Sequence, residues 1–257
     1  MKKDGVIAKK LIDTKYMDET RVLINNKVSH FILRIDVDPA SGIQYDKLVN
    51  DLKPKSSSYK VELHTNFNID VNKQQVNKQD FLKHILGFGQ FVRLYIDTFL
   101  NAIIIDASHY ETNTVYKAIL GDIIQALTTQ DVDVYANRVG MRFINTFPCT
   151  KREDISKVFK SPEAKAIKDG VDKESVSRVM VVEEFQEADY MKRVQFGIPN
   201  KFYPAVITNL DLTLDIDVYT SGRQQMSLWS EIVSSCNHIA YDTFVSYVKD
   251  SYLDSMK

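Results

Sequence analysis

Two arginines and a glycine form the most distinctive pattern of charged residues in the chain. Arg138 and Arg142 flank Gly140 in the stretch Arg-Val-Gly-Met-Arg-Phe-Ile-Asn. Side chains alternate between the two faces of a β-strand, so both arginines and Gly140 would share one face. Guanidinium groups bind carboxylates and phosphates through paired hydrogen bonds. This face is therefore expected to meet either carboxylates of the chain itself or an anionic ligand.

Acidic residues with the same alternation occur elsewhere in the chain. Asp215 and Asp217 lie in the stretch Asp-Leu-Thr-Leu-Asp-Ile-Asp-Val, and Asp36 and Asp38 repeat the spacing near the start. Carboxylates two residues apart on a strand can hold a divalent cation through oxygen ligands. Other predicted strands contribute further cations that could join an anion site: Arg34, Arg178 and Arg193.

Two interpretations of these residues stay open. In an antiparallel sheet with one face in water, charged residues alternate with apolar ones, and opposite charges pair across strands for roughly 0.2–1 kcal/mol each. The other interpretation is an anion site on the arginines, with a metal ion on Asp215 and Asp217. We favour internal pairing, because Asp-x-Asp alone is a weak metal signal and no lysine is spaced to complete a nuclease-like set.

The usual catalytic signatures are missing from the sequence. The nine glycines form neither a dinucleotide-binding fingerprint nor a phosphate-binding loop, and there is no nucleophile elbow. The five histidines lack metal-ligand spacing, and Cys149 and Cys236 are too few and too far apart for a disulfide framework. No catalytic residue and no cofactor is predicted, which favours a non-enzymatic protein while leaving an enzyme open.

Composition places the chain among ordinary globular proteins. It has 257 residues, 44% of them hydrophobic and 26% charged, with a formal net charge of −1. This charge does not favour nucleic acid as a partner, although a local basic patch stays possible. No signal peptide and no apolar run of about 20 residues is found, so a cytoplasmic protein without a membrane span is expected.

Alternating and helical patterns predict the elements that would position these residues. Segment 43–57 is expected to be an exposed loop, and the Asn66–Gln79 run an exposed excursion with little to bury. One helix should begin at the capping box of Ser108 and Glu111, and the last should begin near Ser221 or Ser227 and break near Asn237 or Asp242. The predicted strands are His30–Asp38, Tyr59–Thr65, Gln90–Asp97, Leu100–Ala107, Arg138–Asn145, Val176–Phe185, Tyr190–Ile198 and Asp211–Val218.

These elements predict an α+β fold. A mostly antiparallel, strongly curved sheet would wrap two main helices, and the strand-strand-helix patterns at 90–128 and 190–254 suggest two similar ββα-type halves. The expected division is an irregular N-terminal arm (1–27), a first half (28–150) and a second half (151–257), as one intimate domain or two. Structural roles are expected for Gly140, Asn145, Trp229 and Phe244.

Several of these stretches resemble a sporadically distributed, functionally uncharacterised bacterial family. The resemblance runs from about residue 28 and includes Asn-Ala-Ile-Ile-Ile-Asp-Ala-Ser-His-Tyr-Glu-Thr, the double-arginine strand and the terminal helix with Phe244. The family strand reads Arg-x-Gly-Leu-Arg-Tyr-Ile-Asn, whereas this chain has Met141 and Phe143, and Thr146 where another basic residue is common. The resemblance implies the fold and a component of a phage-defence or other accessory system, and it carries no catalytic residue.

We therefore expect a non-enzymatic interaction or sensor module with a protein partner or self-association, for instance as a homodimer. The last helix or segment 43–57 is the expected contact surface. The alternative is a phosphoanion- or nucleotide-binding protein, or a metal-dependent phosphohydrolase, that uses Arg138 and Arg142 with Asp215 and Asp217.

Overall fold

One large antiparallel sheet organises the protein. The computed structural model describes residues 26–70, 75–110, 113–172 and 175–256. Within them the fold is α+β, and every strand pair is antiparallel. The strands are β1 (Val28–Val37), β2 (Ser58–Asp70), β3 (Gln75–Phe88), β4 (Val92–Asp97), β5 (Ala102–Ala107), β6 (Tyr135–Phe147), β7 (Val179–Glu187), β8 (Tyr190–Ile198), β9 (Leu212–Thr220) and β10 (Gln224–Gln225).

The double-arginine strand β6 lies at the centre of this sheet. The order is β2-β3-β4-β5-β1-β6-β9-β8-β7, with β10 paired to β6 off this path. The sheet is open, so β2 and β7 are its two edges. The helices are α1 (Tyr45–Leu52), α2 (Asn113–Thr128), α3 (Arg152–Val158), α4 (Ser161–Val171), α5 (Trp229–Tyr247) and α6 (Asp250–Asp254), with 3-10 turns at Pro39–Ser41, Lys53–Lys55 and Met226–Leu228.

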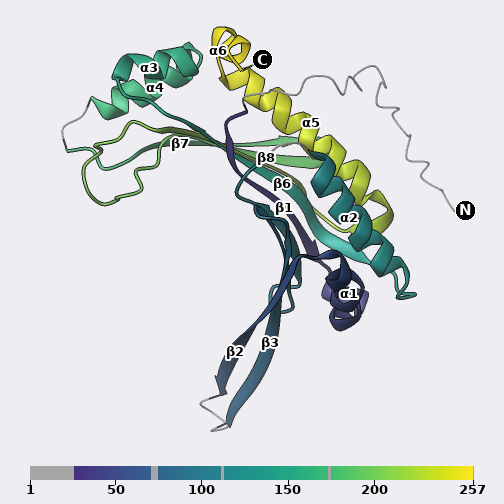
Figure 1. Ribbon diagram of the computed structural model, residues 1–257. Helices are drawn as coiled ribbons and strands as arrows, with labels where there is room; N and C mark the ends of the chain where they lie inside the picture. Colours follow the sequence, from purple (N-terminus) through teal and green to yellow (C-terminus); the bar gives the residue numbers. More distant parts are fainter. Residues whose placement is uncertain (1–25, 71–74, 111–112, 173–174, 257) are drawn as a thin grey trace, which may run out of the picture.

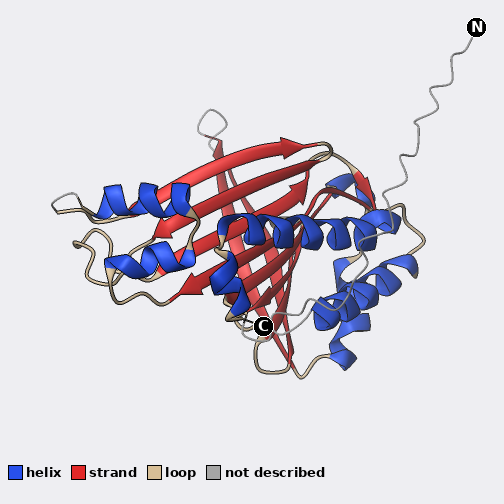
Figure 2. Cartoon of the chain, turned by 90° about the horizontal axis from the view of Figure 1, so that it is seen from above, coloured by secondary structure: helices blue, strands red, loops and turns tan. Residues whose placement is uncertain are grey.

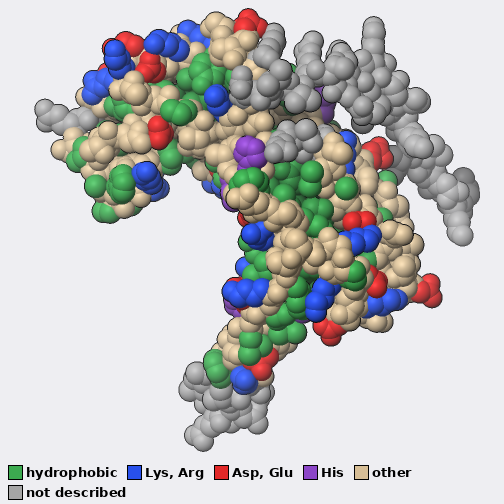
Figure 3. Space-filling view, viewed as in Figure 1, with side chains coloured by type: hydrophobic (Ala, Val, Ile, Leu, Met, Phe, Trp, Pro, Cys, Tyr) green, Lys and Arg blue, Asp and Glu red, His purple; other side chains and the backbone are tan. Residues whose placement is uncertain are grey.

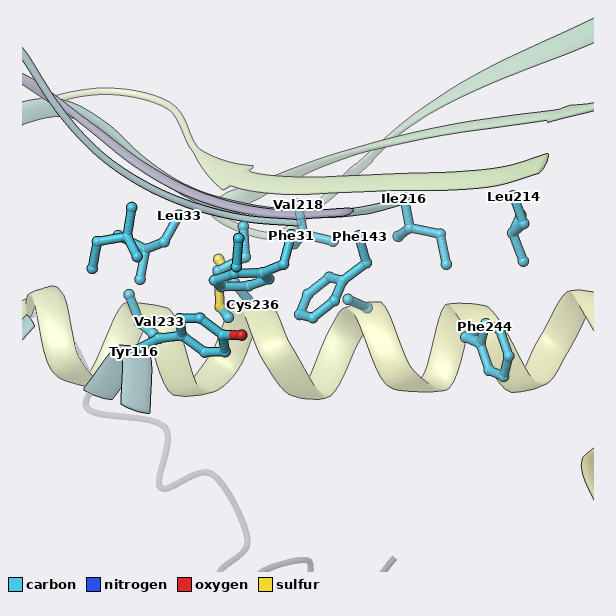
Figure 4. Packing of buried hydrophobic residues seen from close by; sticks show 14 of the residues in the cluster. Phe31, Leu33, Tyr116, Phe143, Leu214, Ile216, Val218, Val233, Cys236 and Phe244 are labelled. Atoms are coloured by element: carbon cyan, nitrogen blue, oxygen red, sulfur yellow. The ribbon is translucent and has the colours of Figure 1, made fainter. Parts of the chain in front are cut away.

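Strict alternation of apolar residues places the core on one face of the sheet. Phe31, Leu33 and Ile35 of β1 are fully buried, and the predicted core residues Val139 and Met141 of β6 lie beside them. Helix α5 packs against β6 and β9. Figure 4 shows Phe31, Leu33 and Phe143 between the strands and α5, with Tyr116 of α2 beside Phe31.

The three helices α1, α2 and α5 lie on the same side of the sheet (Figure 1), and α5 runs across the strands (Figure 2). At the β7 end, α4 packs against β7 and β8. The space-filling view shows a hollow on the side away from α5, between the α3–α4 end and the β2–β3 hairpin, with Lys, Arg and His side chains along its wall (Figure 3). The helix-free face of the sheet is therefore the one turned toward this hollow.

The prediction of a loop over 43–57 was wrong for most of its length. Helix α1 occupies Tyr45–Leu52 and buries Leu48, Val49 and Leu52 against the core. These three apolar residues lie on one side of a short helix of otherwise polar residues. The overall polarity of the segment concealed an amphipathic helix, because three apolar residues in two turns are enough to bury one face.

The Asn66–Gln79 run was expected to be an exposed excursion, and its described side chains are exposed, but the strands in it were not predicted. The residues on both sides of 71–74 form a long hairpin, whose pairing runs from Ser58 opposite Gly87 to Asp70 opposite Gln75. Polar composition concealed these strands. In a two-stranded ladder the inward-pointing backbone groups pair with the other strand and the outward-pointing ones can bind water, so the hairpin can project without burying either face.

Helix boundaries differ in detail from the prediction. Helix α2 begins at Asn113, and Glu111 of the predicted capping box lies outside the described residues. Val115 was expected in the core but is 44% exposed. Helix α5 continues without the predicted break through Asn237 and Asp242 and ends at Tyr247, after which Val248 forms a β-bridge with Phe159.

The N-terminal arm predicted over residues 1–27 lies almost wholly outside the described residues, which begin at Asn26. Among the helices that are described, none is long and apolar enough to cross a membrane.

Candidate functional site

The helix-free side of the sheet, which we call the charged sheet face, collects acidic and basic side chains from nine strands. Strand alternation and register place them together, because residues opposite one another on neighbouring strands point the same way. Its basic members are Lys60, Lys83, Arg93, Arg34, Arg138, Arg142 and Arg193, and its acidic members are Glu62, Asp97, Asp106, Asp36, Asp215, Asp217 and Glu184. Among these described side chains, acids and bases are equal in number, so their formal charges cancel.

Arg142 forms the strongest ion pair of this face. Its Nε and Nη2 donate to Oδ1 and Oδ2 of Asp215 at 2.8 and 2.6 Å. In the pairing of β6 with β9, Arg142 lies opposite Asp217. Its long side chain instead reaches Asp215, the diagonal neighbour on β9. The Asp215 side chain is only 10% exposed. The hydrogen bonds that Arg142 donates to Asp215 raise the pKa of Arg142, although burial acts in the opposite direction.

Arg138 makes a second ion pair between the same two strands. Its Nη2 donates to Oδ2 of Asp217 at 2.8 Å, and its guanidinium lies 3.9 Å from the ring centroid of Tyr219. The Nε of Arg138 is buried and has no hydrogen-bond partner among the described residues. Among the buried side-chain atoms of β6 in the described structure, this Nε is the only one without a hydrogen-bond partner.

The other predicted arginines do not join these two. Arg34 donates from Nε to Oδ1 of Asp36 at 2.7 Å, and Arg193 lies 3.3 Å from Oε1 of Glu184. Arg178 precedes β7 and lies apart from the face. Its Nε donates to the carbonyl oxygen of Pro199, and its guanidinium covers the ring of Tyr203. The structure thus divides the five predicted anion-binding arginines among separate partners.

Gly140 is required by the close approach of β9. A Cβ at this position would overlap the Cβ of Tyr219 and lie 2.9 Å from the carbonyl oxygen of Val218. Tyr219 can therefore cross over the glycine and supply the ring on which Arg138 rests. The absent side chain lets a neighbouring strand approach, and no space is left there for a ligand.

The other predicted structural residues are buried on the helix side of the sheet. Asn145 donates from Nδ2 to the carbonyl oxygen of Leu214 at 3.0 Å, and so joins β6 to β9 through a buried side chain. Trp229 is fully buried at the start of α5. Phe244 stacks on Phe147 with ring centroids 6.3 Å apart.

Metal-binding and nucleophilic chemistry have little support in these residues. Asp215 and Asp217, the predicted metal ligands, each accept hydrogen bonds from an arginine. No group of three or more His, Cys, Asp or Glu within the described ranges is arranged to hold a metal ion. Burial raises the pKa of Cys149 to about 11 and that of Cys236 to about 12, so both remain thiols at neutral pH.

The surface that sequence reasoning missed is the β2–β3 hairpin. Val61 and Leu63 were predicted within the strand Tyr59–Thr65, and Phe67 within the exposed excursion that follows it; they are 41%, 61% and 59% exposed. The available signal was the continued alternation of Val61, Leu63, Thr65 and Phe67 past the predicted strand end. Those residues keep one face of β2 apolar out to Phe67.

The fold and this face together define the class of the protein: an α+β protein with an open antiparallel sheet, helices on one face and paired charges on the other. Comparison with protein-family models gave no match, and neither did comparison with curated proteins.

Proposed function

We propose that the protein is a non-enzymatic interaction or sensor module that works beside a separate effector in a bacterial accessory system, such as phage defence. The observation that carries this proposal is the internal pairing of Arg138 and Arg142 with Asp217 and Asp215. Side chains that already neutralise one another have little left to offer a substrate. The accessory-system context and a cytoplasmic location rest on the family resemblance and the composition.

The charge balance of the sheet face supports a protein partner over a polyanion. A surface that binds nucleic acid gains most of its affinity by neutralising phosphates with unpaired lysine and arginine. Here each of Arg34, Arg138 and Arg142 has a carboxylate within 2.8 Å. A phosphate would have to displace those carboxylates and leave them uncompensated.

We also propose that the chain is a duplication of one strand-strand-helix unit on a strongly curved sheet. From the edge inward the first half runs β3-β4-β5-β1, and the second runs β7-β8-β9-β6 in the same chain order. Helices α2 and α5 follow β5 and β9 in the same way. Strand β2 has no counterpart in the second half, so the hairpin is an addition to the repeated unit.

A phosphoanion-binding protein or phosphohydrolase remains the second candidate, because one observation favours it. The buried Nε of Arg138 has no acceptor in the described structure. A phosphate oxygen at this point would satisfy it, with Asp215 and Asp217 available to bind a metal only if the arginines moved.

Thermal denaturation against a panel of nucleotides, oligonucleotides, inorganic phosphate and divalent metals tests the two candidates. A ligand at 100 times its Kd stabilises the folded state by about 2.7 kcal/mol, which raises Tm measurably. The interaction-module proposal predicts no shift. A shift that disappears in Arg142→Ala and persists in Arg178→Ala, whose guanidinium lies away from the face, would overturn it in favour of the second candidate.

A further inference from the structure

The β2 strand is a long, unprotected edge of the sheet. Among the described residues it pairs only with β3, through thirteen residues from Ser58 to Asp70. Pairing between β3 and β4 begins at Lys83, so no third strand of the described structure lies beside the outer part of the hairpin. Figure 1 shows this hairpin projecting away from the helices and the rest of the sheet. Unpaired backbone groups along such an edge are a template for another strand.

The side chains on one face of β2 add apolar surface to this free edge. Val61, Leu63 and Phe67 point the same way, and all three are exposed large hydrophobic residues. Natural proteins commonly protect edge strands with proline, bulges or inward-pointing charges. The described part of β2 has no proline, and its pairing with β3 runs without a register shift. An apolar edge of this kind marks an interaction site.

We infer that the occupant of this edge is a second copy of the chain, whose β2 pairs antiparallel to the first about a two-fold axis at Leu63. The inference rests on the proposed function as an interaction module and names its partner. In this register Leu63 faces Leu63 of the second copy, Val61 faces Thr65, and Tyr59 faces Phe67. The apolar residues of both copies then lie on the same face of a continuous sheet.

Apolar and charge pairing together select this register. Glu62 of each copy stands opposite His64 of the other, so the two-fold axis creates the same acid–base pair twice. Lys60, which already lies 2.8 Å from Glu62 within one copy, stands opposite the uncharged Asn66. An axis at Val61 would pair Lys60 with Glu62 of the other copy, but Phe67 would then lie beyond the start of the other β2 at Ser58. An axis at Glu62 would instead place two carboxylates opposite each other, and like charges directly opposite are destabilising. The same short segment supplies both the acid and the base, which is why a second copy fits it.

Cysteine crosslinking tests the register directly. Residues on the two-fold axis face their own counterpart, so Leu63→Cys is expected to give a disulfide-linked dimer of about twice 29.5 kDa under mild oxidation. The native Cys149 and Cys236 are buried and do not compete. The matched control is Val182→Cys, at a position 47% exposed on the opposite edge strand β7. It is expected to remain monomeric, and equal crosslinking of both variants would overturn the inference.

Light scattering during size-exclusion chromatography tests the charge pairing without a covalent bond. The wild-type chain is expected to shift from monomer to dimer as its concentration rises. Glu62→Lys removes the carboxylate opposite each His64 and puts a lysine in its place, so it should weaken the dimer about tenfold, and adding His64→Glu should restore it. Circular dichroism of each variant confirms that the exposed substitutions leave the fold intact.

A 29.5 kDa monomer at every concentration, together with no crosslinking of Leu63→Cys, would overturn the dimer. That result leaves the proposed function standing, since a module can bind another partner. Stabilisation by a nucleotide that depends on Arg142 would overturn the proposed function and leave the dimer standing. The two failures can therefore be told apart.

Discussion

At the scale of single residues, Gly140 decides how closely β6 and β9 approach. A side chain at this position would overlap Tyr219. Gly121 of α2 is the opposite case, because a Cβ there would meet nothing within 4 Å. The two glycines therefore predict effects of opposite sign for the same substitution.

Gly140→Ala should lower the free energy of unfolding by about 1–3 kcal/mol, since the strands must separate to admit the methyl group. Gly121→Ala should raise it by roughly 0.5–1 kcal/mol, because alanine is the better helix former. Chemical denaturation of both variants measures the difference. If both change stability equally, the close contact at Gly140 is not what constrains this position.

The sequence predicted which residues carry charge on the sheet but not which ones pair. Alternation placed Arg138 and Arg142 on one face of their strand. It likewise placed Asp215 and Asp217 on one face of a second strand. The diagonal pairing depends on the register between β6 and β9, which are about 70 residues apart in the chain. No pattern within either strand encodes that register. It follows from packing of the apolar faces against α5.

At the scale of elements, the base of the hairpin contains a buried histidine beneath α1. His84 is 4% exposed, its Nδ1 is hydrogen-bonded to the hydroxyl of Tyr59 at 2.9 Å, and its Nε2 has no partner in the described structure. Burial lowers the pKa of His84 below the ordinary value of 6.5, against a smaller opposing effect of Asp46. The folded protein therefore keeps this side chain neutral.

This burial predicts a pH dependence of stability. As the pH falls below 6.5, the ordinary pKa of histidine, the unfolded chain binds a proton at His84 while the folded chain does not, so the free energy of unfolding decreases. His84→Leu should flatten that decrease between about pH 7 and pH 5, and His64→Gln, exposed on the same hairpin, should not. Denaturant titrations at several pH values provide the measurement. An unchanged pH profile in His84→Leu would mean that another group is responsible.

Elements with many apolar residues were predictable, and mostly polar elements were not. The alternation of Asp211–Val218 and the hydrophobic stripe of the last helix correspond to β9 and α5. The outer hairpin and α1 were missed because each carries few apolar residues among many polar ones. Their positions depend on tertiary contacts, such as the burial of Leu48 and Leu52, that a local pattern does not contain.

At the scale of the whole molecule, the packing between β1 and β6 decides whether the two proposed units, β3-β4-β5-β1 and β7-β8-β9-β6, fold independently. Phe143 of β6 contacts Phe31 of β1 with ring centroids 5.1 Å apart, and Tyr110 lies against both rings. Helix α5 from the end of the chain packs on β6. The aromatic contacts join β1 to β6, and the contact of α5 with β6 crosses the predicted boundary at residue 150, so residues from both sides of that boundary share one hydrophobic core.

Phe143→Ala should therefore destabilise the protein as one unit. Loss of a buried aromatic side chain costs about 3–5 kcal/mol, and a shared core predicts a single unfolding transition at lower temperature. Differential scanning calorimetry distinguishes this from two separate transitions. Two transitions, of which only one moves, would indicate independent domains.

The central claim is that the charged sheet face neutralises itself, and a double-mutant cycle on Arg142 and Asp215 tests it most directly. Arg142→Met should cost about 1–3 kcal/mol by leaving Asp215 unpaired, a value reduced because the arginine is 39% exposed. Adding Asp215→Leu should recover most of that loss. A coupling energy near 1 kcal/mol or more is the expected result. Additive effects of the two substitutions would show that the pair does not hold the face together, and would contradict the account.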